Sequence, residues 1–210
     1  MSQQKQTAGI ILAGGRSTRF GRPKQLLKLN DKYLLDYVLS AALESELDHV
    51  VLVLGHDHQN ILRALETRTT QERLQVVINH RYFEGQSRSL QAGLQRIRQS
   101  FPAVMFLLGD QPLLASNTID HMLDRYRHSG KDICVPVCKG KRGNPTIFNR
   151  ILYDQLMAIE GDIGARDIIR ANPERVLYIE LDDPLCFFDI DSQKDFENLQ
   201  SLLKQSNPQV

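Results

Sequence analysis

Apolar residues along the chain form two alternating kinds of segment. Short continuous apolar runs such as Val50–Leu54 predict strands that are covered on both faces, as in a parallel sheet. Segments such as Tyr33–Glu44 carry apolar residues at the spacing of one buried helix face. In chain order, the pattern predicts strands at Ile10–Leu12, Val50–Leu54, Leu74–Ile78, Val104–Leu108 and Ile133–Val135, and helices at Tyr33–Glu44, Asp57–Glu66, Ser87–Arg98 and Ser116–Arg127.

The last third of the chain is less regular. Pro136–Arg150 predicts two extended pieces joined by a basic, glycine-containing loop, and Gly161–Ala165 predicts a second polar loop. The closing helix begins with the spacing of a capping box, in which Ser192 and Asp195 exchange hydrogen bonds. The predicted elements here are helices at Asp167–Ala171 and Ser192–Leu203, and strands at Val176–Leu181 and Phe187–Phe188.

Strands and helices that alternate at this rhythm indicate βαβ units. The predicted fold class is therefore α/β, as a single Rossmann-like layered domain with a mostly parallel central sheet. The 210 residues, of which 41% are hydrophobic, suffice for one well-filled core. We expect this domain to span residues 7–204, with flexible tails at 1–6 and 205–210.

The overall charge makes two classes of partner improbable. The 26 Lys and Arg residues balance 25 Asp and Glu residues, which leaves a net charge of +1 and no overall attraction to nucleic acid or membranes. The first apolar run is interrupted at Gly14, too early for a signal peptide or a membrane span. Three cysteines without a C-x-x-C pair are typical of reduced thiols. We expect a cytoplasmic protein that binds neither nucleic acid nor membranes.

The stretch Gly9–Leu27 carries the first candidate chemistry. Its apolar run ends in Gly14 and Gly15, which let backbone N–H groups approach an anion without a Cβ in the way. The stretch is not a Walker A motif, because five residues separate Gly15 from Gly21 and an arginine follows instead of a lysine. Four cations follow the glycine pair within a short distance, which predicts a local polyphosphate site: Arg16, Arg19, Arg22 and Lys24.

Aspartates follow two other predicted strands. Asp110 follows Val104–Leu108 after a single glycine, Gly109, and Asp189 and Asp191 lie at the end of the last predicted strand. Ligands of a doubly wound sheet bind beyond the carboxyl ends of its strands, where such carboxylates could share a Mg²⁺ ion. Each residue also has a simpler interpretation, because Asp110 could begin a turn and Asp191 could belong to a helix cap. Cations for phosphates together with carboxylates for Mg²⁺ favour phosphoryl or nucleotidyl transfer.

A weaker signal lies in Gly85–Leu90, which opens a predicted helix. Its N-terminus could receive a ribose or a phosphate, or it could simply be capped by Ser87. The basic residues Lys139, Lys141 and Arg142 could cover an anionic second substrate, or form a solvated turn.

Together the motifs resemble the molybdenum cofactor nucleotidyltransferase family, which contains molybdopterin cytidylyltransferase and its guanylyl relative. The first motif is shared with the sugar-nucleotide pyrophosphorylase superfamily, which implies a fold of the nucleotide-diphospho-sugar transferase type. GDQP, RGNP and GDIGAR resemble the cytidylyl branch, whereas Ala13–Gly14–Gly15 resembles the guanylyl branch, since the cytidylyl branch usually has a double alanine here. The matching pieces run in family order over residues 9–199: LAGGRSTRFGRPKQLL, GQSRSLQAG, LLGDQPLL, KRGNPTIF, GDIGAR and FFDIDSQKDFENL.

The resemblance also implies roles for individual residues. Arg19, Lys24 and Asp110 are the implied catalytic residues, with the two cations on the phosphates of the nucleotide. The implied sets are Leu12, Ala13, Gly14, Gly15, Lys24, Ser89 and Asp110 for nucleotide binding, Asp110, Asp191 and Asp189 for Mg²⁺, and Gly143, Asn144, Pro145, Asp162 and Arg166 for the second substrate.

We therefore expect Mg²⁺-dependent transfer of CMP from CTP to the phosphate of molybdopterin or its molybdenum-loaded form, with release of pyrophosphate. Three alternatives stay open. GTP could replace CTP, the acceptor could be another phosphorylated molecule such as a phospholactate or a sugar phosphate, or the protein could be a non-catalytic cofactor carrier or docking protein. A molybdoenzyme or its chaperone is a candidate protein partner.

Overall fold

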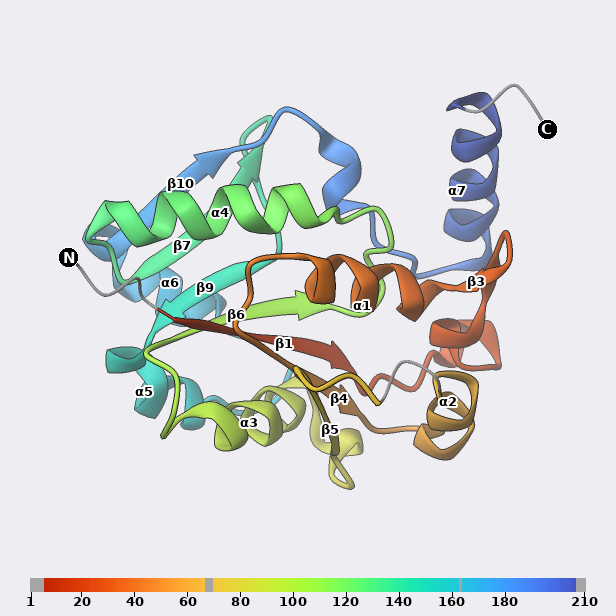
Figure 1. Cartoon of the computed structure of the whole chain (residues 1–210), viewed down its shortest axis with the longest axis horizontal. Helices are drawn as coiled ribbons and strands as arrows, with labels where there is room; N and C mark the ends of the chain where they lie inside the picture. The colour runs from red at the N-terminus through yellow and green to blue at the C-terminus, as the bar shows by residue number, and fades with distance from the viewer. Residues whose placement is uncertain (1–5, 67–69, 163, 207–210) are drawn as a thin grey trace.

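The computed structural model describes residues 6–66, 70–162 and 164–206 and has a mixed α/β architecture (Figure 1). Its main sheet has eight strands in the order β10-β7-β9-β6-β1-β4-β5, with β8 paired to β7. The four strands of the first half all run parallel, as their continuous apolar sequences predict. These are β1 (Thr7–Ala13), β4 (His49–Leu54), β5 (Leu74–Ile78) and β6 (Ala103–Leu108).

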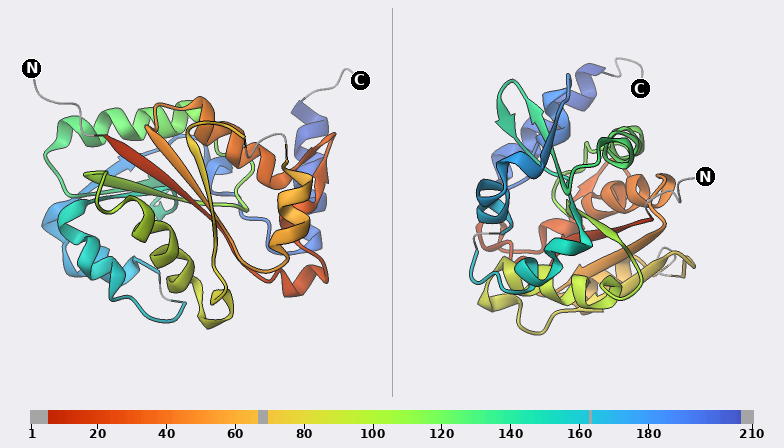
Figure 2. Two further views of the ribbon diagram at one scale, coloured as in Figure 1. Left: turned by 60° about the horizontal axis from the view of Figure 1, so that its bottom comes forward. Right: turned by 90° about the vertical axis from the view of Figure 1, so that its left-hand side faces the viewer.

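Helices cover both faces of this sheet (Figures 1 and 2). One buried cluster joins the sheet to α1, α2 and α4, and a second cluster on the opposite face joins it to α3, α5 and α6. The first group comprises α1 (Leu34–Glu44), α2 (His58–Ala64) and α4 (Ser116–Ser129), and the second α3 (Gln86–Ile97), α5 (Tyr153–Met157) and α6 (Arg166–Ala171).

The second half of the sheet contains an antiparallel strand. β9 (Thr146–Asn149) lies between β6 and β7 and runs antiparallel to both. β10 (Val176–Glu180) pairs parallel with β7 (Ile133–Cys138), and the short β8 (Lys141–Arg142) folds back on β7. The sheet is therefore mostly but not wholly parallel, as predicted.

A smaller unit supports one end of the sheet. The hairpin of β2 (Lys28–Leu29) and β3 (Lys32–Tyr33) packs near α7 (Gln193–Ser206) (Figure 1). A third buried cluster joins these elements through Leu27, Leu29, Leu34, Ile190, Phe196 and Leu199. Ile190, which precedes α7, thus belongs to the same cluster as the hairpin.

The predicted fold class is confirmed, and three local expectations differ from the structure. Phe187–Phe188 was expected as a strand, but Pro184–Phe187 forms a 3-10 turn, because Pro184 opens the turn and the Asp183 side chain accepts a hydrogen bond of 2.9 Å from Leu185 N. The short α5 was not predicted, since five residues carry too little periodicity. α7 reaches Ser206, beyond the expected boundary at 204, and residues 207–210 lie outside the described part. Among the described helices, none has the length and apolar character needed to cross a membrane.

Candidate functional site

A crevice opens where β1 and β6 end side by side. Leu12 pairs with Leu108 in the parallel register, and Gly109 N donates a hydrogen bond of 3.0 Å to Leu12 O. The chain leaves β1 toward β4 and β5, then returns to β6 on the other side of β1. Neighbouring strands whose connections leave in opposite directions create a ligand crevice beyond their carboxyl ends. The glycine loop and Asp110 therefore meet at this edge.

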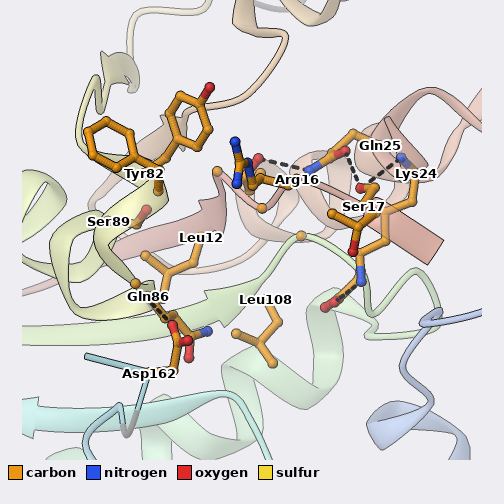
Figure 3. A pocket seen from close by; sticks show the side chains of 18 residues that line it. Leu12, Arg16, Ser17, Lys24, Gln25, Tyr82, Gln86, Ser89, Leu108 and Asp162 are labelled. Carbon is orange, nitrogen blue, oxygen red and sulfur yellow. Dashed lines mark hydrogen bonds and ion pairs between the residues drawn. The ribbon is translucent and has the colours of Figure 1, made fainter. Parts of the chain in front are cut away.

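The glycine loop is folded back onto its own strand. Ser17 adopts a left-handed conformation (φ 50°, ψ 39°), and its Oγ accepts a hydrogen bond of 3.1 Å from Lys24 N. Gln25 is buried and donates from Nε2 to Ala13 O at 2.9 Å. These contacts turn the chain so that the Lys24 side chain points back into the crevice (Figure 3).

Lys24 bridges two of the predicted carboxylates. Its Nζ lies 2.6 Å from Asp110 Oδ2 and 3.1 Å from Asp191 Oδ1. Burial alone would lower the pKa of Lys24, but attraction and hydrogen bonding to the two aspartates outweigh it and raise the pKa above its usual value. Lys24 is therefore a fixed positive charge at neutral pH.

The third predicted metal ligand has a different partner. Asp189 Oδ1 accepts a hydrogen bond of 2.9 Å from Gln111 Nε2. Partial burial and repulsion by Asp110 raise the pKa of Asp189. Asp110 Oδ1 is buried and has no hydrogen-bond partner among the described residues. Within residues 6–66, 70–162 and 164–206, no group of three His, Cys, Asp or Glu side chains is placed to hold a metal ion.

Two clefts meet at Asp110. The first has a volume of about 500 Å³ and the second about 380 Å³. Figure 3 shows Lys24 and Gln86 on opposite sides of the first cleft, with Leu12 and Leu108 between them. Residues from strand ends, α3 and one loop line both clefts, so the two spaces are contiguous: Leu12, Gln86, Leu108, Asp110 and Asp162.

The first cleft collects the residues predicted for the nucleotide. Every predicted nucleotide residue lines it, including Ser89 from α3. Arg19 lies elsewhere, because it is exposed in the turn Thr18–Phe20 and lines neither cleft. Sequence reasoning did not single out three further lining residues: Gln25, Tyr82 and Phe83. Gln86, which also lines this cleft, belongs to the predicted segment Gly85–Leu90. Arg16, one of the four cations of the predicted polyphosphate site, also lines the first cleft from the glycine loop.

The second cleft collects most residues predicted for the second substrate. Gly143, Asn144, Asp162 and Arg166 line it, whereas Pro145 is buried and is not among its lining residues. Asp110, Asp189 and Asp191 also line this cleft. Its floor is apolar and its rim carries three arginines, of which Arg170 was not predicted: Phe106, Val135 and Ile169 below, and Arg142, Arg166 and Arg170 above.

The N-terminus of α3 connects the two clefts. Asp162 Oδ1 accepts a hydrogen bond of 2.8 Å from Gln86 N, and Gly161 O accepts one of 3.1 Å from Ser87 N. Gly85 has φ +114°, and a Cβ there would come within 2.8 Å of the Gly161 carbonyl group. The backbone N–H groups of Gln86 and Ser87, which were candidates to bind a ribose or a phosphate, therefore already donate to the loop that contains Gly161 and Asp162.

Gly14 packs closely against α3. A Cβ at position 14 would lie 2.9 Å from Ser89 Oγ. Ser89 cannot easily move, because it is buried and its Oγ accepts a hydrogen bond of 3.0 Å from Asn79 Nδ2. The space that an alanine methyl group would need is thus already restricted by this hydroxyl group.

Known proteins resemble this chain over most of its length. The family model described as "MobA-like NTP transferase domain" matches residues 9–176. Purine catabolism protein PucB of Bacillus subtilis is 26% identical over 167 residues, which cover 78% of this chain and 80% of that protein. A probable molybdenum cofactor guanylyltransferase of Thermococcus gammatolerans is 31% identical over 130 residues, which cover 61% of each chain.

Solved structures show the same architecture. The crystal structure of Rv0371c from Mycobacterium tuberculosis in complex with manganese is similar with a TM-score of 0.77 and 27% identity, covering 93% of this chain and 98% of that chain. Other curated relatives are bifunctional proteins, and the chain spans about a third of their length.

Proposed function

The chain belongs to the family of MobA-like NTP transferase domains and is a nucleotidyltransferase, and we propose that it transfers CMP from CTP to the phosphate of molybdopterin or its molybdenum-loaded form. Members of this family act on a nucleoside triphosphate and a phosphorylated substrate. One observation carries the proposal: Lys24, held between Asp110 and Asp191, lies where a nucleotide cleft and an acceptor cleft meet.

The reaction needs no side-chain nucleophile. The second pKa of a phosphate monoester is about 6, so the acceptor phosphate is already largely dianionic at neutral pH. One of its oxygens attacks the α-phosphorus of CTP, a new P–O bond forms, and the bond to the β-phosphate oxygen breaks with release of pyrophosphate. Lys24 and Arg16 face this charge from the glycine loop, so catalysis consists of positioning and charge neutralisation.

The carboxylates fit a divalent cation. Asp110 and Asp191 offer hard oxygen ligands, and Asp110 Oδ1 is buried without a protein partner among the described residues. We assign Mg²⁺ to these two residues, with Asp189 held nearby by Gln111. A bound Mg²⁺ would neutralise triphosphate charge and stabilise the leaving pyrophosphate. The manganese complex of Rv0371c supports a divalent cation in a protein of this fold.

The acceptor cleft supports a flat, anionic acceptor. Its floor of Phe106, Val135 and Ile169 offers an apolar surface for a ring system, and Arg142 and Arg166 on its rim can bind phosphate. A phosphorylated pterin combines both properties. A sugar phosphate or a phospholactate satisfies only the arginines.

The choice between CTP and GTP depends on the region around Gly14. Glycine at this position resembles the guanylyl branch, and the Thermococcus relative named guanylyltransferase makes GTP the second candidate. Ser89 Oγ, however, restricts the space of a methyl group at position 14, so glycine here is explained by the packing of α3 and does not imply a larger base. GDQP, RGNP and GDIGAR then favour CTP.

The test is pyrophosphate release with each of the four NTPs, with and without molybdopterin, in Mg²⁺ and in EDTA. We expect release with CTP and molybdopterin together, and loss of activity in EDTA. Preference for GTP would overturn the choice of base, and activity only with another phosphorylated acceptor would overturn the pterin. Failure with every pair, despite binding to a molybdoenzyme or its chaperone, would favour a docking protein.

A further inference from the structure

Asp195 makes one more contact than a helix cap requires. Ser192 precedes α7, and Asp195 Oδ2 accepts hydrogen bonds from Ser192 N at 2.8 Å and Ser192 Oγ at 2.7 Å. Asp195 N donates to Ser192 Oγ at 3.3 Å in return. These bonds form the predicted capping box. The same Oδ2 also accepts a hydrogen bond of 3.2 Å from Asp191 N, one residue outside that box.

This extra bond reaches the charged centre of the site. Asp191 places Oδ1 3.1 Å from Lys24 Nζ, and its side chain is 56% exposed. An exposed side chain is not held by packing, so its position depends on its main chain. The Asp195 carboxylate holds that main chain directly.

The residue before Asp191 is also fixed. Ile190 N donates to Asp110 O at 3.0 Å, and the Ile190 side chain is fully buried beside Phe196 and Leu199 of α7. The segment is therefore tied to Asp110 on one side and to Asp195 on the other. These two contacts hold the Asp191 main chain close to Asp110, so both aspartates can reach Lys24 although they lie on separate parts of the chain.

Arg19 acts on the same carboxylate. Hydrogen bonds from Ser192 are the main reason that the pKa of Asp195 lies below its usual value, and the positive charge of Arg19 lowers it further. Arg19 lines neither cleft, and its charge acts on Asp195 instead of on the lining of the nucleotide cleft.

We propose that Asp195 is a positioning residue for the divalent cation site, because it fixes the Asp191 main chain beside Lys24 and Asp110. The inference rests on the proposed function, in which Asp110 and Asp191 hold the cation. Residues that orient metal ligands typically change metal affinity or activity about 10- to 100-fold when they are removed.

A helix cap without this role makes a different prediction. Ser192→Ala removes the hydroxyl group of the capping box but leaves the bond between Asp195 Oδ2 and Asp191 N in place. Asp195→Ala removes both. If Asp195 only caps α7, the two variants should bind the cation alike.

The experiment measures Mn²⁺ binding by electron paramagnetic resonance of the full chain with a non-hydrolysable CTP analogue. We expect Asp195→Ala to raise the Mn²⁺ dissociation constant about tenfold or more, by the typical effect of losing a ligand-orienting residue. Ser192→Ala should change it less than about twofold. Asp195→Asn, which keeps an amide oxygen as a weaker acceptor, should fall between them. Circular dichroism melting curves confirm that each variant is folded.

The outcomes distinguish the positioning role of Asp195 from the proposed divalent cation site on which it depends. Equal Mn²⁺ affinities for Ser192→Ala and Asp195→Ala, with strong binding by the wild type, would overturn the positioning role alone. If Asp195→Ala fails to fold, Asp195→Asn at wild-type affinity would overturn it equally. Wild-type chain that binds no Mn²⁺ with nucleotide would overturn the proposed metal site and this inference together.

Discussion

The two clefts that meet at Asp110 are built in different ways. The nucleotide cleft takes its shape from strand ends, glycines and buried side chains such as Gln25 and Ser89. The acceptor cleft carries its charge on exposed arginines, including Arg142 and Arg166, above an apolar floor. Lys24 and Asp110, which serve the chemical step, are therefore held by strand ends and by the folded glycine loop. Groups that select the acceptor can change with little effect on the fold.

Removing Lys24 should have the largest effect on activity, because this residue belongs to the nucleotide cleft and contacts two of the aspartates. We expect Lys24→Ala to lower kcat/KM about 30-fold or more, since lost transition-state contacts cost about 2 kcal/mol or more. The measurement is pyrophosphate release with CTP and molybdopterin. Lys28→Ala, which removes an exposed lysine of β2, is the matched control and should retain activity. Release within about threefold of wild type in both Lys24→Ala and Asp110→Ala would contradict the assigned chemistry.

Gly85→Ala would disturb the connection between the clefts. The new Cβ would meet the Gly161 carbonyl group at 2.8 Å, and φ +114° is strained for any side chain. We expect a loss of about 2 kcal/mol in the free energy of unfolding, measured in urea, and a higher KM for both substrates. Gly130→Ala is the control, because Gly130 has φ +65° with open space around it and should cost only about 1 kcal/mol. Equal costs would show that the contact with Gly161 is unimportant.

Arg166→Ala tests the acceptor cleft. The Arg166 side chain is exposed, so its loss should raise the KM for molybdopterin about fivefold, as expected for about 1 kcal/mol of exposed charge interaction. The KM for CTP and the melting temperature should stay unchanged. Arg63→Ala removes an exposed arginine of α2 far from the acceptor residues and serves as the control. A parallel rise in both KM values would mean that the clefts do not divide the substrates as described.

Gly14→Ala tests the packing of the nucleotide cleft, and it should have the smallest effect on activity. The methyl group would crowd Ser89 Oγ, so we expect a loss of about 1 kcal/mol in the free energy of unfolding. Ser89→Ala in the same chain should recover part of this loss, measured by a double-mutant cycle in urea. The preference for CTP over GTP, measured by pyrophosphate release, should change less than about threefold. A switch toward one nucleotide would instead make position 14 a determinant of base choice.

Gly14, Lys24 and Asp110 could be predicted from the sequence, because short segments of the chain determine where each of them lies. Gly14 and Asp110 follow the ends of two neighbouring parallel strands and so lie at the same edge of the sheet, and Lys24 follows Gly14 closely enough in sequence to reach Asp110. The choice between Arg16 and Arg19 was not predictable in this way. It depends on the left-handed Ser17 and on a bond from Lys24 N, which together decide the direction of each side chain.

Other features were hidden because they depend on distant parts of the chain. The capping of α3 by Asp162 joins segments 76 residues apart, and neither segment alone indicates the other. The turn Pro184–Phe187 has a local cause instead, because Pro184 and the Asp183 side chain set it, whereas the apolar pair Phe187–Phe188 alone predicts a strand.

Asp191 follows Lys24, Asp110 and β9 along the chain, and this order has a consequence for synthesis on the ribosome. The glycine loop, Lys24 and Asp110 are all translated before β9, the strand that covers the free edge of β6. A nascent chain at that stage has the parallel strands of the nucleotide cleft and an unpaired strand edge, which is a hazard for aggregation. Lys24 then has only one of its two carboxylates. The completed charge cluster therefore forms only after Asp191 has emerged, so chains that stop before this residue lack the centre assigned to catalysis.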